Sequence, residues 1–386
     1  MTYIPLRKEP PEGPVTHALV LGIGHYPHKP ELNMASAADS AKYMVDWLLN
    51  NAENIIPPLG SIDVLISDPP DTDHRYPWAH SGNVENVTAE HLKNAGTRWN
   101  DLFAEGSQNS AFFYACGHGA MMGTDPAVLI EDLNQDQFEP WIHLQVGSLA
   151  RSIKHNKNVE SAFLFVDACA EKVPAFALAD EDEKPAVVCY PPSQFGVTAR
   201  ANTIVISAAP DGGLAYEAEL PRNDEEPEFN GVKIGCFTQA LVNALKGNSV
   251  RERDNKWAVS SSGLQHDLKP LFRFFFTALD EQPFEPSVLY GFNEERWLVR
   301  PENPQIPVVV QTNPLEEFDR FYLSVNHEEP RTSDAMVDGD TMAKCWRPVL
   351  PPGFDPVYFV AFDGDNEHWE LFRPTRPKFD LKVPVG

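Results

Sequence analysis

Two residues of this 386-residue sequence have the side chains and the setting that nucleophilic catalysis needs. His118 follows the apolar run 110–116 (SAFFYAC), and Cys169 follows the apolar run 161–167 (SAFLFVD). In an open parallel sheet, functional residues gather at the carboxyl ends of the strands, so both side chains are expected at one edge. There a thiolate can attack a carbonyl carbon while an imidazole carries the proton. Taken singly, each residue is more often structural.

Glycines on both sides of the histidine suit such a site. Gly117 and Gly119 carry no side chain, so a substrate main chain can approach closely. Main-chain N–H groups near a nucleophile can also stabilise the negative charge that develops on the attacked carbonyl oxygen. We expect the N–H groups of Gly119 and Cys169 to form this oxyanion hole.

Strand-like and helix-like segments alternate through the first 300 residues. Short apolar runs are typical of buried parallel strands, and apolar residues at helical spacing lie between them. This alternation predicts an α/β fold in which helices flank a mostly parallel sheet. The expected strands are 18–24, 61–67, 110–116, 161–167 and 202–207, and the expected helices are 35–50, 89–103, 144–155, 235–246 and 264–279.

The pattern changes near residue 300. A proline-rich stretch from 301 (PENPQIPVVVQTNP) leads into strand-like pieces without a convincing helix. We therefore expect one domain over 1–300 and a small β-sandwich-like domain over 305–386. Within the first domain, the connection 170–201 separates two strong strand signals, and connections of this length are commonly functional.

Charge and composition exclude several classes of partner. The chain has 31 lysine and arginine residues against 56 aspartate and glutamate residues, a net charge of −25. This balance argues against nucleic acid and against anionic membrane surfaces. No apolar run approaches the ~18 residues of a membrane helix, and the N-terminus does not resemble a secretory signal. Five irregularly spaced cysteines indicate neither a disulfide framework nor a metal site, so a reducing cytoplasm is expected.

Five segments in order resemble motifs of the caspase-like cysteine peptidases, the group that holds caspases, paracaspases, metacaspases and bacterial relatives. Segment 114–119 (YACGHG) resembles the histidine motif Y-x-G-H-G, and segment 166–169 (VDAC) resembles the cysteine motif D-[AS]-C. The histidine and cysteine are 51 residues apart, close to the spacing of roughly 50 in caspases. The other three segments are 18–39, 207–211 (SAAPD) and 235–241 (GCFTQAL).

The resemblance implies a cysteine endopeptidase with Cys169 as nucleophile and His118 as base. Asp39, Asp167 and Asp211 match acidic positions of the first substrate pocket in metacaspase-like and paracaspase-like members. Such carboxylates can hold a guanidinium in bidentate fashion, so we expect cleavage after arginine, with lysine tolerated. Asp39 is also compatible with a charge near a helix N-terminus, and Asp211 with a turn residue.

The family resemblance also suggests how the protein is processed and which partners and cofactors it has. Many members are cut in the linker that corresponds to 170–201, where Lys172, Lys184 and Arg200 are candidate self-cleavage sites. An ordinary exposed acidic loop explains the segment equally well. The expected partners are protein substrates with exposed arginine or lysine, and an activating protein in a stress or anti-phage response. No cofactor is expected; some metacaspases respond to calcium, but no D-x-D-x-D-G loop is present. The alternative is a non-proteolytic scaffold of the same fold.

Overall fold

The computed structural model describes most of the chain. The described residues are 3–6, 13–70, 78, 84–122, 125–136, 141–170, 186–187, 201–221, 229–276, 286–290, 294–333, 336–353 and 355–385. Packing divides the chain into two compact units. Unit 1 comprises Met1–Val242 and Pro283–Leu298, and unit 2 comprises Asn243–Gln282 and Val299–Gly386. The division into domains over 1–300 and 305–386 stays a prediction.

Unit 1 is built on a seven-stranded sheet in the order β1-β3-β2-β4-β8-β10-β15. The five inner strands run parallel, and the edge strands β1 and β15 are antiparallel. Every residue of β2, β3 and β4 is buried, as expected of strands covered on both faces. The mostly parallel sheet predicted from the sequence is confirmed. Its strands are β1 (Tyr3–Pro5), β2 (Thr16–Ile23), β3 (Leu59–Ser67), β4 (Asn109–Cys116), β8 (Val159–Asp167), β10 (Asn202–Ser207) and β15 (Ser287–Tyr290).

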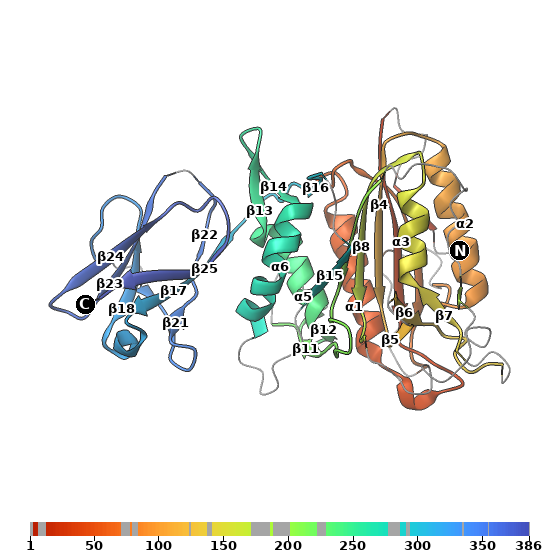
Figure 1. The fold of residues 1–386 in the computed structure, drawn as a ribbon, viewed down its shortest axis with the longest axis horizontal. Helices are drawn as coiled ribbons and strands as arrows, with labels where there is room; N and C mark the ends of the chain where they lie inside the picture. The colour runs from red at the N-terminus through yellow and green to blue at the C-terminus, as the bar shows by residue number, and fades with distance from the viewer. Residues whose placement is uncertain are drawn as a thin grey trace. The chain divides into compact units, whose positions relative to one another are not determined.

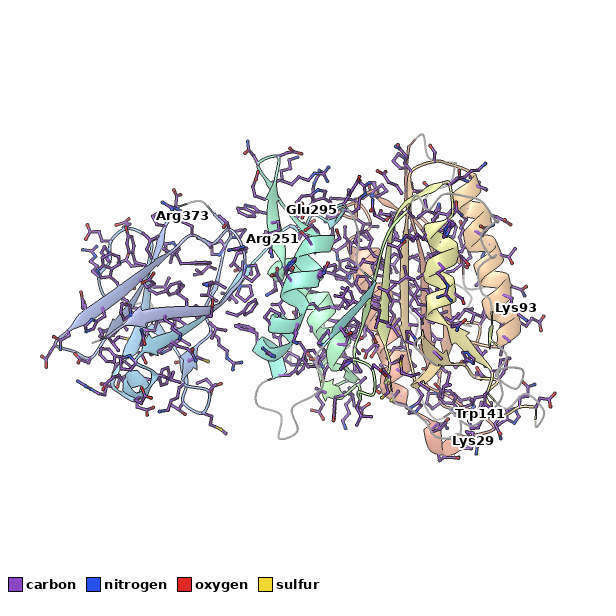
Figure 2. All side chains as sticks on the ribbon, viewed as in Figure 1. Lys29, Lys93, Trp141, Arg251, Glu295 and Arg373 are labelled. Atoms are coloured by element: carbon purple, nitrogen blue, oxygen red, sulfur yellow. The ribbon has the colours of Figure 1, made fainter. Side chains whose placement is uncertain are left out.

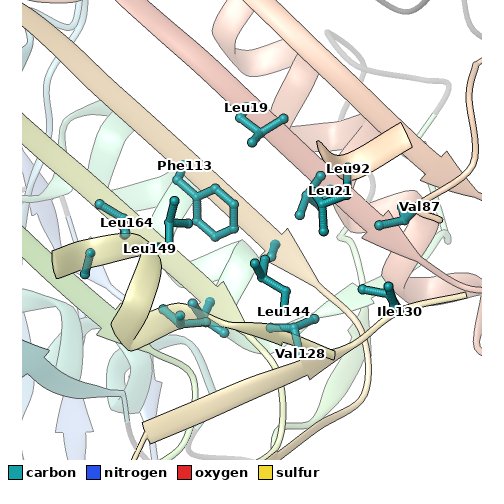
Figure 3. Packing of buried hydrophobic residues seen from close by; sticks show 14 of the residues in the cluster. Leu19, Leu21, Val87, Leu92, Phe113, Val128, Ile130, Leu144, Leu149 and Leu164 are labelled. Carbon is teal, nitrogen blue, oxygen red and sulfur yellow. The ribbon is translucent and has the colours of Figure 1, made fainter. Parts of the chain in front are cut away.

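Helices cover both faces of this sheet. On one face lie α2 (Ala89–Ala104) and α3 (Val146–Lys154), and on the other lie α1 (Ala35–Asn50) and α5 (Cys236–Asn243) (Figure 1). Along each strand, successive side chains point to opposite faces of the sheet. Figure 3 shows Phe113 of β4 packed among leucines of the α2 and α3 side, whereas Phe112 stacks on Trp47 of α1.

Two helices contact the sheet in different ways. A Cβ at Gly22 of β2 would come within 2.6 Å of the Cβ of Ala41, so the missing side chain lets α1 lie directly on the strand. On α2, Leu92 is buried in the core, and the neighbouring Lys93 points away from the sheet (Figure 2). This amphipathic pattern is consistent with the helix expected over 89–103.

Some predicted boundaries differ from the structure. The expected helix 144–155 begins only at Val146, because His143–Gln145 forms strand β7. The expected helix 235–246 begins at Cys236, because Lys233–Gly235 forms β12, and its last turn widens into a π-turn, η4 (Ala244–Asn248). Gly247 in that turn has φ +126°, a conformation that favours glycine and ends the helix.

Small sheets extend the edge of the main sheet that carries the strand ends. One has the order β5-β6-β7-β9, and a hairpin pairs β11 with β12. The sequence did not predict these strands, because each is short and depends on partners far along the chain. Their bounds are β5 (Gly119–Met122), β6 (Asp125–Leu129), β7 (His143–Gln145), β9 (Ala186–Val187), β11 (Glu217–Glu219) and β12 (Lys233–Gly235).

Unit 2 combines helix α6 (Ser261–Phe276) and the hairpin of β13 (Val250–Arg253) and β14 (Lys256–Ser260) with a C-terminal β region. That region holds the sheets β20-β21-β17-β22 and β19-β18-β23-β24, mostly antiparallel, with β25 added in parallel to β17. The predicted C-terminal β region is confirmed. Its strands are β17 (Ile306–Asn313), β18 (Tyr322–Asn326), β19 (Met336–Val337), β20 (Gly339–Asp340), β21 (Cys345–Trp346), β22 (Val349–Leu350), β23 (Val357–Phe362), β24 (Glu367–Phe372) and β25 (Lys378–Pro384).

Candidate active site

The ends of β4 and β8 bring the predicted histidine and cysteine to one edge. The two strands are parallel neighbours in register, with Cys116 opposite Asp167. The N–H of Gly117 donates to the carbonyl oxygen of Asp167 at 3.3 Å, which keeps the chains together beyond the strands. His118 and Cys169 come immediately afterwards, and both are half-buried.

Close main-chain packing joins the two segments. A Cβ at Gly119 would overlap the carbonyl oxygen of Cys169 and press on the side chain of Ala168. The glycine after His118 is therefore required by the approach of the cysteine segment itself. The oxyanion role expected of the Gly119 and Cys169 N–H groups stays a prediction.

The ring and the main chain of His118 are both anchored. Its Nε2 lies 2.9 Å from the carbonyl oxygen of Leu32. Because a carbonyl only accepts hydrogen bonds, this contact places a proton on Nε2. Its main-chain N–H donates to the hydroxyl of Tyr26 at 3.1 Å, and the same hydroxyl donates to the carbonyl of Leu129 at 3.3 Å. The ring centroids of Tyr26 and His118 lie 5.5 Å apart.

Both anchors come from the loop between β2 and α1. The side-chain oxygen of Asn33 accepts the N–H of Tyr26 at 2.8 Å and a bond from His25 Nδ1 at 3.2 Å. The N–H of Met34 donates to the carbonyl of Gly24 at 2.8 Å and closes the loop. The sequence reasoning missed Tyr26 and Leu32 as site residues; their position just beyond the end of an inner strand was the available signal.

The thiol of Cys169 also has a main-chain neighbour. The N–H of Ala215 points at its sulfur at 3.3 Å, a position from which it can stabilise negative charge there. The next residue, Ala170, donates to the carbonyl of Gly213 at 2.9 Å and accepts from the N–H of Gly212 at 2.8 Å. The turn that follows β10 thus supports the segment carrying the thiol.

Asp167 lies directly beneath this edge. It is 3% exposed, and burial raises its pKa to about 6, while hydrogen bonds from Thr238 lower it part of the way. Thr238 donates to Oδ2 through its hydroxyl at 2.5 Å and its N–H at 3.2 Å. The glycine at 235 leaves room for this carboxylate, since a Cβ there would overlap Oδ2.

The other two predicted pocket acids have different surroundings. Asp39 pairs with Lys42 at 3.0 Å, and Lys42 also bonds Asp68 at 2.8 Å. Burial raises the pKa of Asp39, and the nearby lysine opposes that shift. Asp211 is exposed on the turn after β10. Their joint role with Asp167 in one pocket stays a prediction.

Glu217 is a further acid near Asp167 that the sequence reasoning did not select. It lies on β11 opposite Gly235, the residue that covers the Asp167 carboxylate. Burial raises the pKa of the Cys116 and Cys236 thiols, and the charges of Asp167 and Glu217 add to the increase. Glu217 also pairs with Lys233 at 3.8 Å. In the sequence, Glu217 follows Asp211, the last residue of the SAAPD segment, by six residues.

Three further points concern self-cleavage, metal binding and membrane insertion. The candidate self-cleavage residues Lys172, Lys184 and Arg200 lie outside the described residues. Across the described ranges, no three His, Cys, Asp or Glu side chains gather to hold a metal ion. None of the helices in the described part of the chain is both long enough and apolar enough to cross a membrane.

A mostly parallel sheet with a thiol and an imidazole at one edge is the arrangement expected of an α/β cysteine hydrolase. Residues 15–260 match the caspase domain family, and the chain belongs to that family. Proteins with this domain form a family of cysteine peptidases.

Two individual proteins are similar to parts of the chain. The uncharacterized protein y4kE of Sinorhizobium fredii (strain NBRC 101917 / NGR234) is 26% identical over 196 residues, which cover 50% of this chain and 50% of that protein. The match thus spans half the length of the relative. Among solved structures, pro-sf-caspase-1 matches 73% of this chain and 95% of its own at 12% identity, with a TM-score of 0.39.

Proposed function

We propose that the protein is a cysteine endopeptidase that cleaves after arginine and tolerates lysine. The observation that carries the specificity is the carboxylate of Asp167, two residues before Cys169. Its Oδ2 accepts both hydrogen bonds from Thr238, and Oδ1 accepts none within the described part of the chain. An ionised oxygen without a donor, next to the nucleophile, is a fitting partner for a cationic side chain.

The carboxylate of Asp167 is almost completely buried. The fully buried side-chain polar atoms without a partner, in the described residues, belong to Trp47, Asp63, Thr312, Thr332 and Arg347. Asp167 is not among them, and the residue as a whole is 3% exposed. A guanidinium that donates to Oδ1 would recover the desolvation cost of the buried charge.

The chemistry follows from the pair at the strand ends. Cys169 Sγ attacks the carbonyl carbon after the arginine, and its proton passes to Nδ1 of His118, because Nε2 already donates to Leu32. The C–N bond then breaks, and the imidazolium protonates the leaving amine. Water, deprotonated by the same imidazole, hydrolyses the thioester and restores the thiol. We assign the oxyanion to the N–H groups of Gly119 and Cys169.

Asp39 and Asp211 are proposed as acids of the substrate pocket beside Asp167, and Glu217 is a further candidate. The net charge of −25 suits basic substrates, because it attracts them to the surface. Self-cleavage after Lys172, Lys184 or Arg200, and a role as a cytoplasmic stress or anti-phage effector, belong to the proposal through family analogy alone.

The test compares cleavage of an arginyl reporter peptide with that of a matched citrullyl peptide, in which a neutral urea replaces the guanidinium. The wild type is expected to cleave the arginyl peptide, and Cys169→Ala is expected to cleave neither peptide. Cys345→Ala should keep the wild-type ratio of arginyl to citrullyl cleavage, because Cys345 is a buried thiol of unit 2. Labelling of Cys169 by an arginyl chloromethyl ketone gives a second readout. Full cleavage by Cys169→Ala contradicts the proposal; absence of both cleavage and labelling in the wild type favours the scaffold alternative.

A further inference from the structure

Three buried groups from separate elements form one line of hydrogen bonds ending at Asp167. The hydroxyl of Tyr114 on β4 lies 2.5 Å from the hydroxyl oxygen of Thr238 on α5. The Thr238 hydroxyl donates to Asp167 Oδ2, also at 2.5 Å. Tyr114 and Thr238 are completely buried.

The direction of this line is fixed by its chemistry. An ionised carboxylate only accepts, so the single hydroxyl proton of Thr238 goes to Asp167. The contact between the two hydroxyls must then use the proton of Tyr114, which donates to Thr238. Burial raises the pKa of Tyr114 well above its usual value, so this proton stays in place across ordinary pH.

The neighbouring glycine makes the arrangement possible. A side chain at Gly235 would overlap Oδ2, so only glycine lets the start of α5 approach the carboxylate. The N–H of Gly235 donates to Ser40 of α1 at 2.9 Å, and Ser40 donates to the carbonyl of Ser36 at 2.6 Å. The segment is thereby fastened from its other side.

We propose that Tyr114 and Thr238 are positioning residues for substrate specificity: they hold Asp167 ionised, with Oδ1 turned toward the arginine of the substrate. This inference rests on the proposed function and deepens it. It assigns a physical task to the glycine and threonine of segment 235–241, which the family resemblance alone left unexplained.

The surroundings of Asp167 leave few competing charges. Its titratable neighbours are Tyr114 and Cys116 on β4 and Cys236 on α5, and Glu217 on β11 acts on the two thiols. Burial raises the pKa of both thiols, which keeps them neutral. Glu217 is exposed and pairs with Lys233, and burial is what disfavours the ionised form of Asp167. The donors from Thr238 are thus the groups that favour ionisation.

The decisive variant is Thr238→Val, which keeps the shape and removes the hydroxyl. We expect kcat/KM for the arginyl reporter to fall about tenfold, mainly through KM, with citrullyl cleavage unchanged. Because one donor to the charged form is lost, the acid limb of the arginyl pH profile should move to higher pH. Thr238→Ser restores the donor and should restore both values, and Tyr114→Phe should give a smaller shift in the same direction.

Two controls separate positioning from folding. Thr203→Val removes a buried hydroxyl on β10 and should leave the arginyl-to-citrullyl ratio unchanged. Alkylation of Cys169 by iodoacetamide, which needs no pocket, should keep its wild-type rate in Thr238→Val. A variant that loses both reporters equally, or keeps the wild-type acid limb, overturns the inference. A wild type that does not prefer arginyl over citrullyl peptide overturns the proposed specificity first.

Discussion

The hydroxyl of Tyr26 is hydrogen-bonded to the main-chain N–H of His118 at 3.1 Å, and the Tyr26 side chain is completely buried. The same loop supplies the carbonyl of Leu32 that holds the imidazole of His118 at Nε2. The position of the base is therefore set by a segment more than eighty residues earlier in the chain, and the loop after β2 is part of the site.

Replacing Tyr26 by phenylalanine should slow the chemical step while affecting substrate binding little. The change removes the hydrogen bonds of the Tyr26 hydroxyl to the N–H of His118 and to the carbonyl of Leu129, which costs about 1–3 kcal/mol. We expect kcat to fall roughly tenfold with KM nearly constant. Steady-state kinetics measures both, and Tyr358→Phe, in unit 2, is the matched control. An unchanged kcat would show that the hydroxyl does not position His118.

Asp167→Asn should remove the preference for arginine and leave the thiol reactive. The amide keeps the size of the side chain but lacks the charge, so kcat/KM for the arginyl reporter should fall roughly tenfold to a hundredfold. In the wild type, the same preference should decline as the pH falls through about 6, because protonation neutralises the carboxylate. Reporter assays between pH 5 and 8 test both statements. A preference that is independent of pH in this range would contradict the assignment.

The ion pair of Arg98 with Asp63 should contribute strongly to stability. Asp63 on β3 is 1% exposed, and burial raises its pKa to about 6 against the opposing effect of Arg98. Arg98→Ala leaves this buried carboxyl group unpaired and should cost about 3–5 kcal/mol in urea unfolding. Arg320→Ala breaks an exposed pair with Glu317 and should cost less than about 1 kcal/mol. Equal losses in the two variants would show that the burial of Asp63 is unimportant.

His17 should make the protein less stable in mild acid. Burial lowers its pKa to about 4 in the folded state, from 6.5. Between these values the unfolded chain binds more protons, so the contribution of His17 is present above pH 6.5 and is lost as the pH falls toward 4. The loss approaches about 3 kcal/mol at pH 4. Asp63 and Asp167, whose pKa values are raised to about 6, shift stability in the opposite direction over this range.

The contribution of His17 is isolated by comparison with His17→Gln, which can still bond Ser61, the present partner of the ring at 2.8 Å. Urea unfolding at pH 6.5 and pH 4.5 should show a smaller loss in the variant than in the wild type. If both proteins lose the same stability between these pH values, His17 does not become protonated only upon unfolding.

The sequence predicted what depends on local patterns. The inner strands are continuous apolar runs, and α1 was expected at its observed bounds because its apolar residues follow a helical period. His118, Cys169 and Asp167 were found because the ends of parallel strands must share an edge. Contacts between distant segments had no such signal. The pairing of His143–Gln145 in β7 and the bond of Lys42 to Asp68 are examples, since neither can be derived from neighbouring residues.

The two hydrogen bonds between Ala170 and the turn at Gly212 and Gly213 have a consequence for processing. Together with the parallel pairing of β8 and β10, they join the chain before residue 171 to the chain after residue 200. A protein nicked between these points would keep both fragments in one particle. It would migrate as two bands on a denaturing gel and elute as a single peak from a sizing column. Cleavage there could change access to Cys169, but it would not release the thiol from its sheet.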